Sequence, residues 1–280
     1  MNGRKGLPCY RAAVEATLIA PSGGASAEVA HGRLETHWLG RIEYGPAWSL
    51  QKRLAAARAD DRIVDQLLLL EHPQVLTLGR TSDPAHIVAS AEELAARGID
   101  VVRVERGGEV TYHGPGQLVA YPILALGRRG LLVRPLVRAL EAAMIETCRA
   151  MGVEAVRREG QPGCWVDPGG PAPRKIGALG LRVERGVSYH GIALNVTVDL
   201  ADFELIDPCG MPGVVSTSIA AERGSDEAPS TASVEGAARV FAASLVARLG
   251  ADAALALPDV LPDPAVTIPA LERMLEAAGA

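Results

Sequence analysis

The sequence contains few cysteines and very few lysines, and both shortages limit what the protein can be. Its four cysteines, Cys9, Cys148, Cys164 and Cys209, are far apart and form no CxxC pair. This spacing argues against a zinc ribbon and a dense disulfide framework, and it favours reduced thiols in a cytoplasmic protein. Lysine occurs only at positions 5, 52 and 175, so any lysine kept within a motif of this arginine-rich chain deserves consideration as a functional residue.

Several other features are missing. No apolar run approaches the roughly 18 residues of a membrane helix, and we expect no signal peptide, because no compact apolar segment precedes a cleavage site. No GxGxxG or Walker A motif indicates a nucleotide cleft, and a net charge of −5 gives no support to nucleic-acid binding. A local group of arginines, at positions 128, 129, 134 and 138, could meet an acidic partner or form a solvated face.

The pattern of apolar residues predicts an α+β fold, with a mixed or antiparallel sheet and flanking helices, because many strands are adjacent hairpins. We expect a flexible extension over residues 1–33, one catalytic domain over 34–250, and a C-terminal extension over 251–280. Gly45-Pro46 indicates the start of a first helix, and a capping box from Ser90 to Glu93 indicates the start of a second. Pro135 is expected to start a long helix that ends near Gly152, with Cys148 in the core. Further helices are expected over 234–249 and from Pro269 to Ala278, and a hairpin over 174–184 and 187–196.

The stretch from Arg106 to Gln117, RGGEVTYHGPGQ, is the most informative part of the chain. It lies between two strand-like runs, yet it holds four glycines and a proline where a simple turn needs one or two glycines. Glycines let a backbone approach a ligand closely, and the stretch also carries Arg, Thr, Tyr and His side chains. A long polar hairpin is the plain interpretation, and a binding loop is the functional one.

Three further residues are candidates for chemistry. Cys209 lies in Pro-Cys-Gly, a tight non-helical setting, and would be reactive only if a neighbouring cation favoured its thiolate. Lys175 begins a strand whose glycines, at positions 177 and 180, suggest that something approaches the backbone. A lysine near a cysteine could take its proton. The alternative readings are an inert buried cysteine and an exposed lysine.

The histidines give weaker signals. His113 closes the glycine-rich stretch and is the better pocket candidate, whereas His72, before Pro73, is ambiguous. His190 shares a strand face with Ile192, Leu194 and Val196, which is more typical of a hydrogen-bonded core histidine. A hydrolase built from Cys209, His190 and Asn195 is conceivable, although no local sequence fixes it.

Taken together, these motifs resemble the lipoyl(octanoyl) transferases, the octanoyl-carrier-protein:protein N-octanoyltransferases of lipoate biosynthesis. The resemblance covers roughly residues 34 to 250. It rests on the glycine-rich stretch and on the following motifs: Tyr44, Trp48 and Gln51; Glu71-His72-Pro73; Thr77-Leu78-Gly79-Arg80; Arg174-Lys175-Ile176-Gly177; His190-Gly191-Ile192-Ala193-Leu194-Asn195; Pro208-Cys209-Gly210.

The resemblance implies the fold of biotin and lipoyl protein ligases and a ping-pong transfer. Cys209 would take the octanoyl group as a thioester, and Lys175 would lower the thiol pKa and act as base. The donor would be an acyl carrier protein. The acceptors would be lipoyl domains of 2-oxoacid dehydrogenase E2 subunits and the glycine cleavage H protein. No metal or ATP is expected, and the enzyme is expected to be a cytoplasmic monomer.

The resemblance also implies which residues bind the acyl chain and the carrier arm. They are Arg106, Gly107, Gly108, Glu109, Val110, Thr111, Tyr112, His113, Ala178, Leu179, Gly180, Gly191, Ile192 and Ala193.

Two alternatives remain at this point. An ATP-dependent lipoate- or biotin-protein ligase would share the fold and a similar lysine motif, but it activates a free acid and needs no nucleophilic cysteine. A silent protein that binds lipoyl domains or carrier protein would show binding without an acyl-cysteine. The Pro-Cys-Gly motif and the His-Gly-Pro-Gly-Gln form of the turn favour the transferase.

Overall fold

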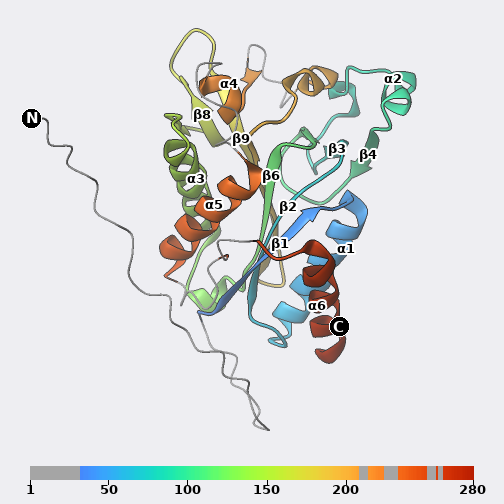
Figure 1. Ribbon diagram of the computed structural model, residues 1–280, viewed down its shortest axis with the longest axis vertical. Helices are drawn as coiled ribbons and strands as arrows, with labels where there is room; N and C mark the ends of the chain where they lie inside the picture. The colour runs from blue at the N-terminus through green and yellow to red at the C-terminus, as the bar shows by residue number, and fades with distance from the viewer. Residues whose placement is uncertain (1–31, 208–213, 224–232, 251–256, 258–260) are drawn as a thin grey trace, which may run out of the picture.

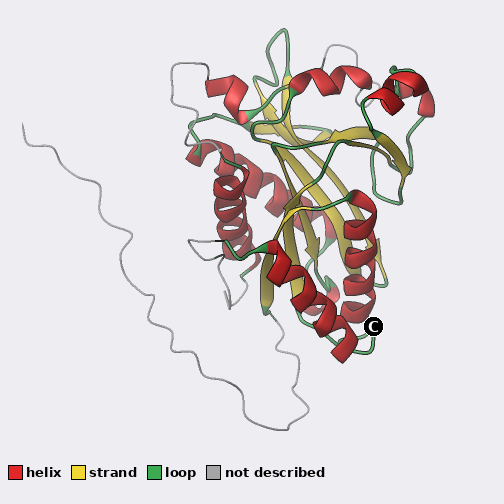
Figure 2. Cartoon of the chain, turned by 45° about the vertical axis from the view of Figure 1, so that its right-hand side comes forward, coloured by secondary structure: helices red, strands yellow, loops and turns green. Residues whose placement is uncertain are grey.

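The computed structural model describes residues 32–207, 214–223, 233–250, 257 and 261–280 (Figure 1). A large mixed sheet runs through the centre, with helices on both of its faces (Figure 2). The strands are β1 Leu34–Arg41, β2 Asp65–Glu71, β3 Val75–Leu78, β4 Asp100–Arg103, β5 Val110–His113, β6 Gln117–Ile123, β7 Val156–Arg158, β8 Gln161–Val166, β9 Arg174–Glu184, β10 Val187–Asn195 and β11 Val215–Ser216. The α-helices are α1 Tyr44–Ala59, α2 Ala91–Ala96, α3 Val133–Ala150, α4 Ile219–Arg223, α5 Val234–Leu249 and α6 Pro264–Ala277, and the 3-10 helices are η1 Pro84–His86, η2 Gly127–Arg129 and η3 Leu200–Leu205.

The main sheet has the strand order β1-β2-β6-β10-β9-β8-β7, and β11 pairs with β9. The pairs β1–β2 and β11–β9 are parallel, and the others are antiparallel. The predicted hairpin is confirmed, because β9 and β10 pair with Val187 opposite Glu184. The mixed α+β architecture predicted from the sequence is therefore present.

Helices cover both faces of this sheet, which explains its apolar composition. On one face α3 and α5 enclose a core that includes Leu140, Phe241 and Cys148, as expected for this cysteine. On the other face α1 and α6 enclose a second core that includes Leu54 and Leu271. Strand β2, with its run of leucines, is buried along its whole length because it lies between these two layers.

A second, smaller sheet has the order β4-β3-β5 and packs on a third apolar cluster with Tyr112 and Leu205. Its presence corrects the interpretation of the glycine-rich stretch as a plain hairpin turn. Residues 110–113 form strand β5, which pairs with β3, whereas β6 belongs to the main sheet. The stretch therefore carries the chain from one sheet to the other, and the strand before it, β4, pairs with β3 in parallel.

The predicted helices are present, with shifted starts. Helix α3 begins at Val133, so Pro135 lies in the first turn, where its missing N–H group needs no partner. Helix α6 begins at Pro264, because the Asp263 side chain accepts a hydrogen bond from the N–H of Ala265 at 2.8 Å. The expected start at Pro269 was wrong, since that proline lies inside the helix.

The capping box is only half formed. The Ser90 hydroxyl accepts from the N–H of Glu93 at 3.1 Å, while the Glu93 carboxylate pairs with Arg97. Among the described helices, none has the length and apolarity that crossing a bilayer requires.

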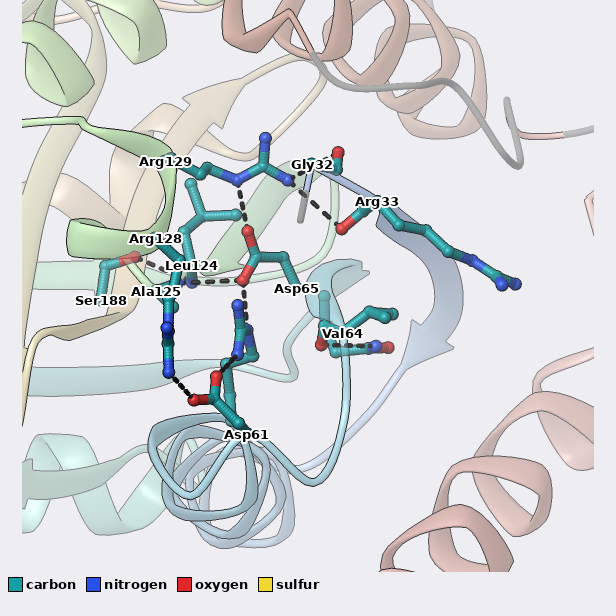
Figure 3. A network of polar contacts seen from close by, with 12 residues as sticks. Gly32, Arg33, Asp61, Val64, Asp65, Leu124, Ala125, Arg128, Arg129 and Ser188 are labelled. Atoms are coloured by element: carbon teal, nitrogen blue, oxygen red, sulfur yellow. Dashed lines mark hydrogen bonds and ion pairs between the residues drawn. The ribbon is translucent and has the colours of Figure 1, made fainter. Parts of the chain in front are cut away.

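The predicted arginine group is divided by the fold. Arg129 is mostly buried and pairs with Asp65, which also accepts from Arg58 at 2.6 Å and from the N–H of Ala125 at 3.0 Å (Figure 3). Arg128 pairs with Asp61 at the surface. This network joins the end of α1, the start of β2 and helix η2. Arg129 is therefore structural, whereas Arg128 lies on the solvated surface.

Candidate active site

A cavity lies between the glycine-rich stretch and strands β9 and β10. It has an empty volume of about 820 Å³, mouth included, and a mainly apolar lining. Of the residues that the resemblance assigns to substrate binding, all except Gly107 and Tyr112 line it, as does Lys175. Three segments that are far apart in the sequence thus meet around one space.

The two exceptions have other positions. The N–H of Gly107 donates to the carbonyl of Leu181 on β9 at 3.0 Å, so Gly107 holds the stretch against this strand through its backbone. Tyr112 points into the third apolar cluster, and its hydroxyl donates to the buried Asp202 carboxylate at 2.5 Å.

Glycines are needed where the stretch passes β9 and the end of β3, because its backbone comes very close to both. A Cβ atom on Gly180 would lie 2.7 Å from the Gly107 carbonyl oxygen, and one on Gly79 would lie 2.2 Å from that of Gly108. Gly108 itself has a φ of +87°, which residues with side chains rarely adopt. The glycine pattern therefore reflects close packing of the stretch over the cavity.

A chain of hydrogen bonds links the glycine-rich stretch to the strand that carries Lys175. The Gln117 amide nitrogen donates to the Asn195 side-chain oxygen at 2.9 Å, and the Asn195 amide nitrogen donates to the carbonyl of Thr217 at 2.9 Å. The N–H of Thr217 then donates to the carbonyl of Lys175 at 3.0 Å. Asn195 is therefore engaged on both sides, and it does not orient His190 as the hydrolase alternative requires.

The same chain fixes the protonation of His113. Because the Gln117 amide nitrogen donates elsewhere, its oxygen must accept from His113 Nδ1 at 2.7 Å, which leaves Nε2 as an acceptor. Burial lowers the pKa of His113 well below its usual value. The Arg106 guanidinium next to it donates to the Thr77 carbonyl at 2.6 Å.

His72 is also a buried neutral histidine. Its Nδ1 lies 2.7 Å from the carbonyl of Ile42 and must donate, so its Nε2 accepts from the Tyr121 hydroxyl at 2.7 Å. Burial lowers its pKa to about 4. His72 is not among the residues that line the cavity, and its hydrogen bonds give it a structural role.

His190 does not share a face with Ile192, Leu194 and Val196 as the alternation of the strand predicts. Its φ is +53°, and this left-handed conformation turns the side chain toward Tyr121 and Tyr189, which belong to the other core. Its Nε2 is buried without a hydrogen-bond partner, and burial lowers its pKa to about 4. His190 lines the cavity, so the expectation of a hydrogen-bonded core histidine was wrong.

Lys175 lines the cavity together with Ser216, its partner in the β11–β9 ladder. Its Nζ is 5.2 Å from the centre of the buried Trp165 ring, within the range of a cation–π interaction. Cys209 lies outside the residues that the structure describes, as does Cys9. The other two cysteines, Cys148 and Cys164, are buried free thiols.

Comparison with known proteins identifies the family. A family model described as the lipoyl protein ligase A/B catalytic domain matches residues 43–242. The chain belongs to this family. An octanoyltransferase from Chloroflexus aurantiacus is 47% identical over 218 residues, which cover 78% of this chain and 92% of that protein. An octanoyltransferase from Acidobacterium capsulatum is 50% identical over 192 residues, which cover 66% and 78%.

Solved structures show that the fold is that of the family. An archaeal bipartite lipoate protein ligase from Thermoplasma acidophilum matches with a TM-score of 0.57 at 17% identity, covering 88% of this chain and 91% of that one. A lipoate-protein ligase A bound with ATP matches with a TM-score of 0.56 at 17% identity, covering 88% and 93%. The relatives confirm the predicted acyltransferase class, and the solved structures confirm the predicted fold.

Within this family site, sequence reasoning missed Tyr44, Val119, Tyr121, Phe203 and Ser216 as residues that line the cavity. Tyr44 lay in a motif of the resemblance without a role. Val119 and Tyr121 alternate along β6 and therefore share the face toward α1, a signal that was available once β6 was placed beside β10. Phe203 and Ser216 come from segments without regular patterning, so no local signal indicates their place at the cavity.

Proposed function

We propose that this chain transfers an octanoyl group from an acyl carrier protein to a lysine of lipoyl domains, through a thioester on Cys209. The observation that carries the proposal is that Lys175 and the glycine-rich stretch line one mainly apolar cavity. An apolar cavity beside a basic residue suits a fatty acyl thioester, whose hydrocarbon must be buried while its carbonyl reacts.

The neighbours of Cys209 in the chain support its role. On one side, the N–H of Asp207 donates to the carbonyl of His86, and the His86 ring lies 3.4 Å from Glu109, which lines the cavity. On the other side, Ser216 pairs with Lys175 in the β11–β9 ladder and also lines the cavity. Of the described residues that flank Cys209 in the chain, Ser216 therefore lines the cavity, and Asp207 is linked to it through His86 and Glu109.

The chemistry proceeds in two balanced steps. Lys175 takes the proton of the Cys209 thiol, and the thiolate attacks the acyl carbonyl. A carbon–sulfur bond to Cys209 forms, the bond to the carrier arm breaks, and the departing thiolate receives the proton. In the second step the neutral amine of the acceptor lysine attacks the acyl-cysteine, an amide forms, and its released proton returns Cys209 to the thiol through Lys175. The donor thioester is already activated, so the proposed reaction uses neither ATP nor a metal.

The acceptors in this proposal are lipoyl domains of 2-oxoacid dehydrogenase E2 subunits and the glycine cleavage H protein. The membership of the chain in a lipoyl protein ligase family supports this acceptor class. The names of the relatives support octanoyl transfer over the ATP-dependent alternative.

The test is the intact mass of the protein after mixing with octanoyl-carrier protein without ATP, and again after a lipoyl domain is added. We expect an octanoyl-sized gain that maps to Cys209 and then moves to the acceptor lysine. Cys209→Ser should abolish the gain and Lys175→Ala should abolish transfer, whereas the matched controls Cys148→Ala and Lys52→Ala should retain both. Acceptor modification that appears only with octanoate and ATP would instead establish a ligase.

A further inference from the structure

Strand β9 is irregular at the point where it carries Lys175. Cys164 of β8 pairs with Gly177. The next residue, Trp165, pairs with Lys175 and not with Ile176, so β9 holds one extra residue here. Ile176 belongs to the core under α3 and α5, and a Cβ atom on Gly177 would lie 3.2 Å from the Cys164 Cβ of the same core. Two successive residues therefore face one side of the sheet, as they do in a β-bulge.

The bulge decides which side of the sheet Lys175 faces. Regular alternation would put Lys175 on the side of Gly177, toward the apolar core. The extra residue reverses this assignment, and Lys175 lines the cavity instead. Residues that lie directly opposite each other in an antiparallel pair share a face, so Trp165 is the nearest cross-strand neighbour of the lysine.

The Trp165 ring is placed where it can attract cations. Its side chain is fully buried, and its indole N–H donates to the carbonyl of Gln161 at 3.1 Å, which fixes the ring. The Lys175 Nζ lies 5.2 Å from the ring centre, and the guanidinium of Arg158 on β7 lies 5.0 Å from it. Both distances are within the roughly 6 Å over which the electron-rich face of an indole attracts a cation. The ring is therefore an electrostatic contact for both side chains.

Gly163 gives the stem of the lysine its path to the ring. A Cβ atom on Gly163 would lie 3.2 Å from the Lys175 Cε and 2.5 Å from the Gly177 carbonyl oxygen. Gly163 also has a φ of +133°, which favours glycine. The aliphatic part of Lys175 therefore packs on the backbone of β8, two residues before the tryptophan that its Nζ approaches.

We propose that Trp165 is a positioning residue, whose ring holds the Lys175 ammonium group at the cavity and thereby favours transfer of the Cys209 proton to it. This inference rests on the proposed function, in which Lys175 is the base. The S–H bond of Cys209 breaks, an N–H bond to Nζ forms, and no further reactant is needed. The ring attracts the resulting ammonium much more strongly than the neutral amine. In a mainly apolar cavity it replaces part of the hydration that the charge lacks.

The size of the effect follows from the strength of cation–π contacts. Such a contact changes an equilibrium constant by between about twofold and thirtyfold, with the larger values at buried sites. Weakening it should therefore slow the acylation of Cys209. Trp165 is not among the residues that line the cavity, so the binding of the donor should change little.

The test changes the electron density of the ring and keeps its shape, because replacing a fully buried tryptophan by a smaller residue can disturb the fold. Mono-, di- and trifluorinated tryptophan are incorporated at position 165, where each fluorine weakens the attraction of the ring for a cation. The readout is the single-turnover rate of Cys209 acylation at saturating octanoyl-carrier protein, followed by intact mass.

The other two of the three tryptophans receive the same series as controls. Trp38 is 5% exposed and reports the effect of fluorine within a packed core. Trp48 has a cation of its own, because the Lys52 Nζ lies 4.7 Å from its ring centre. It reports the loss of a cation–π contact elsewhere, since neither control residue lines the cavity.

We expect the acylation rate to fall with each fluorine at position 165, by about threefold or more with three. The donor concentration at half-maximal rate should stay near its value in the unmodified protein, and both control series should leave the rate unchanged. A rate that does not depend on fluorination of Trp165, or an equal decline in either control series, would overturn the proposal. Failure of the unmodified protein to form an acyl-cysteine would count against the proposed function instead.

Discussion

Substitution of Asn195 should lower both the stability of the protein and its activity. It is 5% exposed, and its amide makes two hydrogen bonds of 2.9 Å, one from Gln117 and one to the carbonyl of Thr217. Thr217 in turn donates its N–H to the carbonyl of Lys175. Asn195→Ala removes the link between the glycine-rich stretch and the strand that carries Lys175.

The magnitude follows from the lost bonds. Each contributes about 1 kcal/mol net, and the partners left behind in a buried place raise the total to about 2–3 kcal/mol. For a domain of this size 1 kcal/mol corresponds to about 2–4 °C, so Tm should fall by about 4–12 °C. Because the β9–β11 ladder beside Lys175 loses its support, kcat should fall by roughly tenfold while KM changes less.

Thermal unfolding and octanoyl transfer to a lipoyl domain measure the two effects. Asp199→Ala is a suitable control, since it removes only one exposed hydrogen bond, from the N–H of Ala201 at 3.0 Å. We expect the control to lower Tm slightly and to leave kcat unchanged. A loss of less than 1 kcal/mol in Asn195→Ala, with wild-type kcat, would refute the argument that this chain of hydrogen bonds positions Lys175.

Three further predictions follow from the fold. Gly180→Ala places a Cβ atom 2.7 Å from the Gly107 carbonyl oxygen, so the glycine-rich stretch must shift. The KM for octanoyl-carrier protein should therefore rise severalfold, and unchanged kinetics would contradict this prediction. The pKa values of His72 and His190 are lowered to about 4, so their contribution to stability is complete above about pH 6.5 and is lost as the pH falls toward 4. Tm should decline over that range with net proton uptake on unfolding, and a flat profile would contradict it. Asp65→Asn leaves the mostly buried Arg129 without its charged partner and removes one of the two carboxylates that pair with Arg58, so urea unfolding should show a loss of about 3–5 kcal/mol.

Much of this fold could be predicted because the local signals agree with the tertiary structure. A continuous apolar run such as the four leucines of β2 is typical of a strand buried on both faces, and the structure places helices on each side of it. The glycines at positions 177 and 180 suggested that something approaches the backbone of β9, and at Gly180 this is the carbonyl of Gly107, 2.7 Å from where a Cβ atom would lie. Motifs that impose one geometry, such as these, are readable from one sequence.

Pairing between distant strands was harder to predict. Strand β5 is only four residues long, and its partner β3 lies about thirty residues earlier, so no local turn signal connects them. The stretch therefore looked like a loop between β4 and β6, although it joins two sheets. The positions of Phe203 and Ser216 depend on the same long-range pairing, because each is brought to the cavity by segments that have no periodic pattern.

His190 shows a different limit, and it explains why part of the cavity could not be derived from the sequence. Strand alternation assigns a face to each residue on the assumption that every φ is negative, and one left-handed residue reverses the assignment. A glycine at this position would have indicated that a positive φ is possible, whereas a histidine gives no such indication. A glycine follows directly at position 191, but the left-handed residue itself carries an imidazole, so the reversal places a ring in the lining of the cavity, with Nε2 buried and without a hydrogen-bond partner.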